Sequence, residues 1–489
     1  MKRIFSSPFV ALAAGLCLRL FFVLRFPTTS GDTALYEQIA TNWINYGIYA
    51  MDVAGKITPV DIRVPGYPAF LAIIYALSRH SGASARPWVV LAQVGLDLIT
   101  CFVIAALAAL LISSVATRGN TNRVFIAALW LASLCPFTAN YTAVPLTEVF
   151  AIFVTACALY YMVLLFRRID FPLFGLRSTR VDSSRSVEYA AIGAGLLTGI
   201  GALFRPETPL VLVAAALIFL GIFYRRREIF RGLLVVAILG ASCFLPLLPW
   251  GVRNMITLNE LQFLAPRDSN LPGELVPHGF MSWEKTWLFR MSDCYLVTWK
   301  LNDEPIDPDE IPGRAFDTPE ERQRVAAILE QYNDEVTLTS EEDAAFAQLA
   351  RERTARRPLR TYVWLPAARA MTLWFSPRIE RLPYSGHVFP LAQTGGDDPV
   401  DQSVTIILFL LNIAYVALAL WGAIRLWRRV LGVRPVVLFF ASFIILRTAF
   451  LTTVEAPEPR YMLVCFPVLI ALAAQLFARH SVNTQTVSS

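Results

Sequence analysis

The stretch GDTALYEQIATNWINYG, residues 31–47, and the stretch RVPGYPAFLA, residues 63–72, bound the first long polar segment of the 489-residue chain. Ser30 to Thr33 form a helix-start signal, and apolar residues recur behind it at helical spacing. These apolar positions are Leu35, Ile39, Trp43 and Tyr46. The pattern predicts a short amphipathic helix that lies flat on a membrane surface and carries the carboxylate of Asp32 at its start.

The composition is typical of a membrane protein. Hydrophobic residues make up 56% of the chain and charged residues 16%, whereas soluble domains contain about 25% charged residues. Apolar runs recur at close to the ~20 residues that an α-helix needs to cross a bilayer, which predicts an all-α polytopic protein. Much of the basic charge behind the net +6 lies in short loops between these runs. That distribution indicates membrane topology and not a nucleic-acid surface.

Several signatures of other protein classes are absent from the sequence. The cysteines lie mostly in apolar segments and show no CxxC spacing, so neither a disulfide framework nor a metal site is predicted. There is no P-loop, no GxGxxG motif after a strand and no GxSxG motif, so nucleotide hydrolysis and serine-hydrolase chemistry have no support. Residues 1–26 have a basic start and an apolar core without a cleavage site, and we expect them to be retained as a first span.

Ten apolar stretches are candidate spans, and one shorter stretch is not. The spans are residues 9–26, 88–113, 123–139, 146–166, 188–204, 208–224, 231–250, 403–424, 435–453 and 460–479. Arginine-rich loops after residues 166, 224 and 424, together with the basic N-terminus, predict that these loops and both termini are cytoplasmic. Residues 66–80 fall short of the ~17 residues usual for a span. The topology is consistent only if they form a juxtamembrane or re-entrant helix on the outer face.

This topology collects the unusual polar segments on the extracytoplasmic side of an inner (plasma) membrane. They are the 27–68 loop, the turn before Glu148, the corner from Arg205 to Glu207, the 251–402 segment and the turn from Glu455 to Arg460. We therefore expect one active site on that face.

The 251–402 segment is too long for a plain connection. Helix-start signals at Thr318 and Ser340 predict a small, mostly helical extracytoplasmic insert. Aromatic residues beside arginines in residues 360–376 predict an interfacial helix within it. The expected domains are a transmembrane module (1–250) that carries the 27–68 loop, the insert (251–402), and C-terminal transmembrane helices with a short tail (403–489).

Two acidic residues are candidates for chemistry, and each has a structural alternative. Asp32 could be a helix N-terminal carboxylate, worth ~0.3–1 kcal/mol against the helix dipole, or an ionised general base. Glu148 could simply begin a helix, or it could face a wet cavity in the bundle. Together the two carboxylates could hold a divalent cation or shape an acceptor pocket, although no cofactor is certain.

Four arginines break the positive-inside trend, because they flank span ends on the predicted outer side. They are Arg63, Arg205, Arg253 and Arg460. Snorkelling to lipid headgroups is one explanation, and binding of an anionic ligand by the guanidinium groups is the other. Because the four exceptions lie in separate loops, they favour ligand binding over snorkelling.

The order of these motifs resembles the integral-membrane glycosyltransferases of the GT-C type, in particular the protein mannosyltransferases and the lipid A aminoarabinose transferases. The motifs are GDTALYEQIATNWINYG, RVPGYPAFLA, PLTEVFAIF, GLLTGIGALFRPE, PWGVRN and EPRYMLVCFPVL, at residues 31–47, 63–72, 145–153, 195–207, 249–254 and 458–469. The resemblance implies a GT-C fold with about ten transmembrane helices, outer juxtamembrane helices and the helical insert.

The resemblance also implies a function, that of a hexosyl- or pentosyltransferase. A sugar would move with inversion from a polyprenyl-phosphate donor to an acceptor hydroxyl, with Asp32 as general base and outer arginines stabilising the lipid phosphate. The implied substrate-binding residues are Glu148, Arg63, Arg205, Glu207, Arg253, Arg460 and Tyr461.

The sequence departs from the prototypes at several points and leaves alternatives open. Thr33 follows Asp32 where protein mannosyltransferases carry a second acid, and Val64 precedes Pro65 without the basic-Pro-Pro run of the aminoarabinose enzymes. The acceptor could be a protein, a lipid or a polysaccharide. A flippase for lipid-linked sugars, or a ligase that uses a pyrophosphate-linked glycan, are the alternatives. Polar residues at span ends count against transport.

Overall fold

The computed structural model describes residues 7–113, 116–169, 184–266, 268, 271, 274–388 and 398–479. Most of the predicted cytoplasmic loop after residue 166, at positions 170–183, lies outside these residues. The chain divides into two compact units. Unit 1 comprises Met1–Pro266, Pro377–Ile444 and Leu463–Ser489, and unit 2 comprises Arg267–Ser376 and Ile445–Met462.

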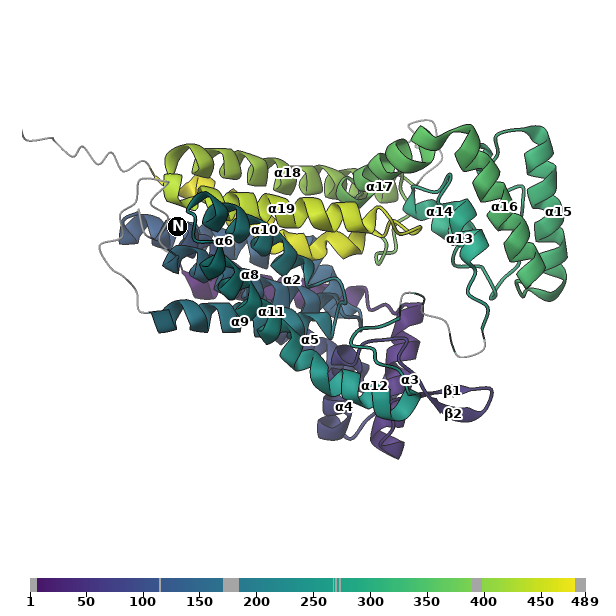
Figure 1. Ribbon diagram of the computed structural model, residues 1–489, viewed down its shortest axis with the longest axis horizontal. Coiled ribbons are helices and arrows are strands. Elements are labelled where there is room, and N and C mark those ends of the chain that lie inside the picture. Colours follow the sequence, from purple (N-terminus) through teal and green to yellow (C-terminus); the bar gives the residue numbers. More distant parts are fainter. Residues whose placement is uncertain are drawn as a thin grey trace, which may run out of the picture. The chain divides into compact units, whose positions relative to one another are not determined.

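Unit 1 is a bundle of apolar helices, most of them long, that run side by side (Figure 1). They are α2 (Pro8–Arg25), α5 (Arg86–Ile112), α6 (Arg118–Ser133), α7 (Pro136–Ala139), α8 (Glu148–Arg168), α9 (Ser184–Ala202), α10 (Leu210–Arg225), α11 (Ile229–Phe244), α18 (Pro399–Arg429), α19 (Arg434–Leu451, whose end belongs to unit 2) and α20 (Phe466–Ala473). Within the described residues, seven helical stretches are long and apolar enough to cross a membrane, or eight if the pair bent by 49° at residues 118–143 is one span. The chain is an all-α polytopic membrane protein, as the sequence predicts.

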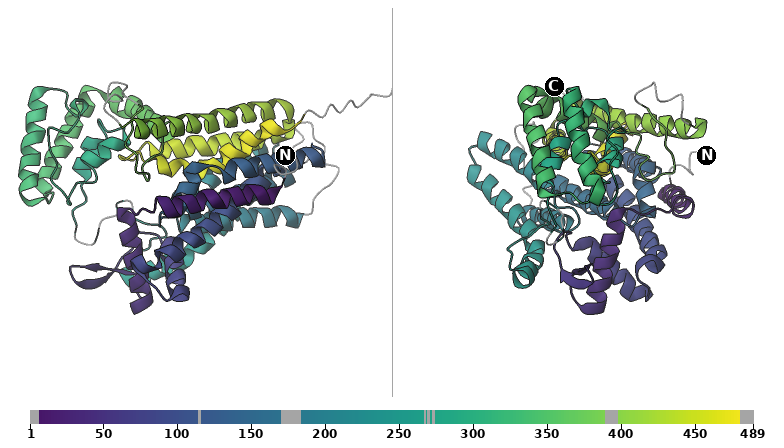
Figure 2. Two further views of the ribbon diagram at one scale, coloured as in Figure 1. Left: turned by 180° about the vertical axis from the view of Figure 1, so that it is seen from behind. Right: turned by 90° about the vertical axis from the view of Figure 1, so that its right-hand side faces the viewer.

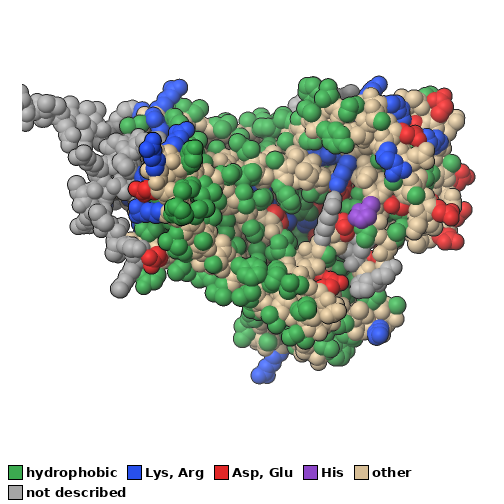
Figure 3. All heavy atoms as spheres, viewed as in Figure 1, with side chains coloured by type: hydrophobic (Ala, Val, Ile, Leu, Met, Phe, Trp, Pro, Cys, Tyr) green, Lys and Arg blue, Asp and Glu red, His purple; other side chains and the backbone are tan. Residues whose placement is uncertain are grey.

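The two ends of unit 1 differ in character. Helix α18 ends, and helix α2 begins, at the end where Lys and Arg side chains gather, while hydrophobic side chains cover the flanks of the bundle (Figures 1 and 3). The opposite end carries the short elements that follow α2, including α3, which turns away from the direction of α2 (Figure 2, left). The basic end of α18 and the first polar segment therefore lie at opposite ends of unit 1.

Short elements build the end of unit 1 opposite the basic loops. They are α3 (Gly31–Tyr46), β1 (Ala50–Val53), β2 (Lys56–Pro59), α4 (Gly66–Ser78) and α12 (Leu248–Leu258). The antiparallel β1–β2 hairpin lies in the region that the sequence indicates as a polar turn. Its two turn residues, Ala54 and Gly55, have φ values of 52° and 78°, as a tight primed turn requires. Helix α4 has 13 residues, which confirms that the 66–80 stretch is too short to cross.

A buried ion pair holds three helices of unit 1 together. Arg19 on α2 is fully buried, and its Nε lies 2.7 Å from Oδ2 of Asp97 on α5. Its Nη1 donates to the carbonyls of Gly15 (2.9 Å) and Ser133 on α6 (2.8 Å). Charges deep in an apolar bundle are stable only when paired and fully hydrogen-bonded. The pair therefore fixes how α2 packs against α5 and α6.

Unit 2 is a helical domain with its own core. Its helices are α13 (His278–Glu284), α14 (Met291–Leu296), α15 (Pro319–Glu335), α16 (Ser340–Arg356) and α17 (Leu365–Trp374), and a π-helical turn (Arg360–Trp364) precedes α17. The core is aromatic and includes Phe280, Trp283, Trp287, Tyr332 and Phe346. This domain matches the predicted helical insert in character.

The helix-start signals in unit 2 are correct in one case and displaced in the other. The Thr318 hydroxyl accepts a hydrogen bond from the backbone N–H of Glu321 (3.2 Å), as predicted. Helix α16 is capped one residue earlier than predicted, because Thr339, and not Ser340, accepts from the Glu342 N–H (3.3 Å). The Glu342 carboxylate accepts from the Thr339 N–H (2.7 Å) and completes a capping box.

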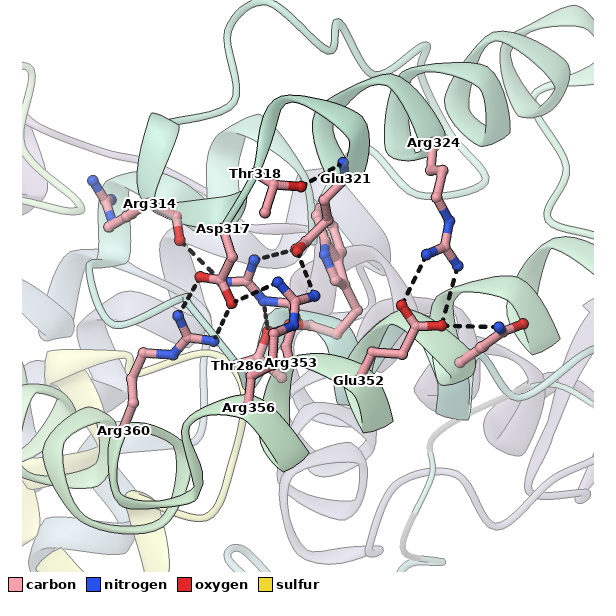
Figure 4. Close-up of polar contacts among 12 residues, drawn as sticks. Thr286, Arg314, Asp317, Thr318, Glu321, Arg324, Glu352, Arg353, Arg356 and Arg360 are labelled. Atoms are coloured by element: carbon pink, nitrogen blue, oxygen red, sulfur yellow. Dashed lines mark hydrogen bonds and ion pairs between the residues drawn. The ribbon is translucent and has the colours of Figure 1, made fainter.

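An ion cluster joins α15 to α16 (Figure 4). Arg353 is fully buried and contacts both Glu321 and Asp317. Arg356 contacts both of these carboxylates, and Arg360 contacts Asp317. Burial alone would raise the pKa of Asp317, but the hydrogen bond from Arg360 and the charges of the three arginines hold it below its usual value.

A buried carboxyl group in α13 makes unit 2 sensitive to alkaline pH. Glu284 is fully buried, and its Oε1 accepts a hydrogen bond from the Thr298 hydroxyl (2.5 Å). Burial raises the pKa of Glu284 from 4.5 to about 8. The folded state thus keeps a proton that the unfolded chain loses first. The free energy of unfolding therefore falls as the pH rises from about 4.5 to about 8.

We expect Glu284→Gln to stabilise the protein at pH 8, by on the order of a few kcal/mol, because the amide is neutral at every pH and still accepts the Thr298 hydrogen bond. At pH 5 the two proteins should unfold at nearly the same temperature. Thermal unfolding of the full-length protein in detergent measures both. The same substitution at the exposed Glu330 is the control. An equal gain in unfolding temperature of Glu284→Gln at pH 5 and pH 8 would contradict the raised pKa of Glu284.

We expect Arg19→Met and Asp97→Leu each to destabilise the bundle by ~3–5 kcal/mol, because each leaves one buried charge unpaired. The double variant should lose much less stability than the sum of the losses of the two single variants. Thermal inactivation of the three variants measures this coupling. Additive losses would show that the two side chains act independently.

Candidate active site

Asp32 lies in the first turn of α3, where local hydrogen bonds fix the helix start. The Ser30 N–H donates to Thr33 Oγ1 (3.1 Å), and the Thr33 hydroxyl donates to the Pro145 carbonyl (3.2 Å). The Asp32 carboxylate accepts a hydrogen bond from Arg63 Nη2 (2.8 Å). Both side chains remain partly exposed, at 27% for Asp32 and 20% for Arg63. The acid is thus held by a cation but stays accessible from outside.

Arg253 binds the backbone of the loop that carries Arg63. Arg253 donates to the carbonyls of Tyr49 (2.6 Å) and Val60 (2.8 Å), and its guanidinium group lies over the rings of Tyr49 and Trp250. The Tyr49 hydroxyl in turn donates to the Arg63 carbonyl (2.8 Å). Arg253 therefore holds the backbone of the loop in this structure, whereas the sequence indicates a role in ligand binding.

Glu148 and Arg205 form a second ion pair in unit 1. Glu148 is buried at the start of α8, and its Oε1 lies 2.6 Å from Nη2 of Arg205. Glu207 approaches the same guanidinium group at 3.8 Å. Glu148 is the first residue of α8, where a helix N-terminus suits a carboxylate side chain. The predicted residues Glu148, Arg205 and Glu207 thus form one cluster.

A close backbone approach connects the Arg63 loop with the Arg205 corner. The Gly66 N–H donates to the Leu203 carbonyl at 2.7 Å. A Cβ at position 66 would lie only 2.5 Å from that oxygen, so glycine is required here. Two motifs that are far apart in the sequence, RVPGYPAFLA and GLLTGIGALFRPE, therefore meet at this contact.

Tyr36 is a site residue that the sequence analysis misses. It lies one helical turn after Asp32 on α3, is buried, and packs edge-on against Tyr67 at 5.1 Å. Burial, and then the charge of Asp32, raise the pKa of Tyr36 to about 12, and the charges of Arg63, Arg205 and Glu148 also act on it. Its phenol is thus a neutral hydrogen-bonding group near both ion pairs. The i, i+4 spacing from Asp32 could have identified it.

Arg460 and Tyr461 belong to unit 2, where they contact Glu458. Arg460 Nε lies 2.5 Å from Glu458 Oε2, and the Tyr461 hydroxyl donates to Glu458 Oε1 at 2.5 Å. The Arg460 guanidinium group lies over the Tyr461 ring, and Arg460 is only 9% exposed. The sequence pattern indicates ligand binding by these two residues, and in the structure they form a compact polar triad with Glu458.

The chemistry available to unit 1 is that of a carboxylate base with guanidinium groups nearby. Asp32 and Glu148, the two candidate cation ligands, each contact an arginine. Among the described residues, no group of three or more His, Cys, Asp or Glu side chains could hold a metal ion. The arrangement suits proton abstraction from a hydroxyl and binding of an anionic leaving group.

Comparison with known proteins gives similarity to solved structures only. No protein-family model and no curated protein matches. The AglB oligosaccharyltransferase from Archaeoglobus fulgidus, in complex with an inhibitory peptide and a dolichol-phosphate, shares 14% identity over 95% of this chain and 50% of its own, with a TM-score of 0.47. ArnT from Cupriavidus metallidurans, bound to undecaprenyl phosphate, shares 12% identity over 96% of this chain and 77% of its own, with a TM-score of 0.38. The chain spans about half the length of the oligosaccharyltransferase. The similarity concerns the fold alone.

We expect Gly66→Ala to lower the thermal stability of the protein, because the added methyl group would press against the Leu203 carbonyl. Overpacking of this kind typically costs ~1–3 kcal/mol. Gly95→Ala on α5 is the matched control, since nothing lies within 4 Å of a Cβ there. The control should unfold at the wild-type temperature or above it. Equal unfolding temperatures for the two variants would show that the approach at Gly66 is not tight.

Proposed function

We propose that the chain is an inverting glycosyltransferase of the GT-C type, which moves a sugar from a polyprenyl-phosphate donor to an acceptor hydroxyl. The observation that carries the proposal is the juxtaposition in unit 1 of two ion pairs, Asp32–Arg63 and Glu148–Arg205. The Gly66–Leu203 contact joins the segments of the two arginines. The order of the sequence motifs supports the same assignment.

Asp32 is the general base in this proposal. Arg63 orients the carboxylate, and partial exposure lets an acceptor reach it. Asp32 takes the proton of the acceptor hydroxyl as that oxygen attacks the anomeric carbon. The bond from this carbon to the phosphate oxygen breaks, and the lipid phosphate leaves with the electron pair. A positioned base contributes about 10²–10⁴-fold to such a step.

The arginines supply the positive charge that a leaving phosphate requires. Guanidinium groups bind phosphate oxygens bidentately, and in a site shielded from water this stabilises the departing group. Arg63 and Arg205 suit this role, because each already holds a carboxylate at 2.6–2.8 Å. Glu148 and Glu207 keep Arg205 in place until the donor binds, and Arg460 with Tyr461 forms a further candidate anion site. A hydroxyl of a protein, a lipid or a polysaccharide is the acceptor.

The reaction takes place on the extracytoplasmic face of the plasma membrane in this proposal, with both termini in the cytoplasm. The separation of the basic loops from α3 along unit 1 supports this orientation (Figures 1 and 3). The lipid-linked donor reaches the site from the bilayer.

We expect Asp32→Asn to lower the rate of sugar transfer by about 10²–10⁴-fold without changing the unfolding temperature, because the amide cannot accept a proton. The measurement incubates purified protein with a panel of polyprenyl-phosphate sugars and acceptors and identifies products by mass spectrometry. Asp52→Asn, at an exposed position on β1, is the control and should retain full activity.

Undiminished transfer by the Asp32→Asn protein would remove Asp32 from the role of base. Transfer of a whole glycan from a pyrophosphate-linked donor would instead identify a ligase. Translocation of a lipid-linked sugar in liposomes, without any transfer, would identify a flippase.

A further inference from the structure

Helix α17 and the π-helical turn before it present an apolar face outward from unit 2. The outward side chains are Leu359 (67% exposed), Tyr362 (71%), Val363 (49%), Trp364 (68%), Met371 (58%) and Phe375 (37%). The opposite face, with Leu365 and Leu373, is buried in unit 2. Hydrophobic side chains are visible on the surface over α17, whereas carboxylates gather over α15 (Figure 3). A folded domain rarely exposes such a face to water without a partner.

A π-helical turn lies at the start of this apolar face. In a regular α-helix, successive side chains are 100° apart, so three in a row point to different sides. In the turn Arg360–Trp364, the three successive residues from Tyr362 to Trp364 are all exposed. Turns of this kind are rare and often lie at functional sites. Here the turn leaves two aromatic rings and an aliphatic side chain exposed in succession.

The buried face of α17 is attached to the end of a membrane span. The Trp374 Nε1–H donates to the Thr448 hydroxyl at 3.0 Å, and Thr448 lies in the last turn of α19. Arg369 donates to the carbonyls of Lys285 (2.7 Å) and Thr452 (3.3 Å), and Thr452 directly follows α19. Residues Leu431–Leu451 are long and apolar enough to cross a membrane. We therefore expect helix α17 to lie at the depth where this span leaves the bilayer.

The chemistry of the face matches that depth. Tyr and Trp are enriched where a membrane meets water, because their rings are apolar and their polar atoms can reach headgroups. Arg357, at the start of the face, is exposed, and the neighbouring side chains of Arg356 and Arg360 contact Asp317. An exposed guanidinium group beside aromatic rings is suited to lipid phosphate.

We propose that the outward face of α17, from Leu359 to Phe375, lies in the interfacial layer of the lipid bilayer and anchors unit 2 to the membrane surface. Phospholipid is thus the partner of this face: the aromatic rings lie among the headgroups, and Arg357 contacts their phosphates. This anchor holds whether or not the chain transfers sugar, because the apolar face and its attachment to α19 do not involve Asp32 or its neighbours.

Photo-crosslinking of the full-length protein tests the proposal. The photoreactive residue p-benzoylphenylalanine is placed singly at Tyr362, at Val363, at Gln331 on α15 and at Leu410. Gln331 is exposed on the polar face of unit 2, and Leu410 is 57% exposed on α18, a candidate span. Each protein is reconstituted in nanodiscs of phosphatidylcholine and phosphatidylglycerol, irradiated and analysed by mass spectrometry.

We expect lipid adducts at positions 362 and 363 with a yield close to that at Leu410 and about tenfold above that at Gln331. Adducts to lipid at Leu410 but not at 362 and 363 would overturn the proposal. Crosslinks from 362 and 363 to a second protein chain would also overturn it, since a protein would then cover the face. The unfolding temperature of each variant is compared with that of the wild type, so that only folded proteins enter the comparison.

Discussion

A guanidinium group that leaves water needs an anion or several carbonyl oxygens around it, and this constraint shapes both units of the structure. Arg19 is held by Asp97, Arg205 by Glu148, Arg353 by Glu321, and Arg460 by Glu458. Each pair joins elements or turns whose relative positions would otherwise be set by apolar contacts alone. Because removing one partner leaves a buried charge, the pairs fix geometry more than they add net stability.

The degree of burial separates the structural pairs from those suited to function. Arg19 and Asp97 are almost wholly enclosed, at 0% and 2% side-chain exposure, so an exchange of partners there would be very costly. The Asp32–Arg63 pair is partly exposed, at 27% and 20%, so separating these two side chains costs much less. The Glu148–Arg205 pair lies between these extremes, with a buried acid and a more accessible arginine. The two pairs proposed for catalysis are therefore more exposed than the structural Arg19–Asp97 pair.

Sequence patterns predict the local elements well, but they predict poorly which distant residues contact one another. The helix start at Ser30–Thr33, the short 66–80 helix and the cap at Thr318 depend on neighbouring residues, and the structure has all three. The cap of α16 moves to Thr339 because its hydroxyl, and not that of Ser340, reaches the Glu342 N–H. The Arg19–Asp97 pair, the role of Gly66 and the position of Tyr36 depend on contacts between distant segments. An arginine and an aspartate inside apolar runs indicate that each has a buried partner, but their spacing in the sequence does not show that they pair with each other.

The two kinds of polar contact in unit 2 have different consequences for its behaviour in concentrated salt. The surface pair Arg324–Glu352 is exposed on both sides, so dissolved ions screen it readily. Arg369 instead binds peptide oxygens of Lys285, Leu288 and Thr452 in a buried setting, where screening is weak. Rising ionic strength therefore loosens the outer edge between α15 and α16 first, and the join between α17 and the end of α19 keeps its geometry.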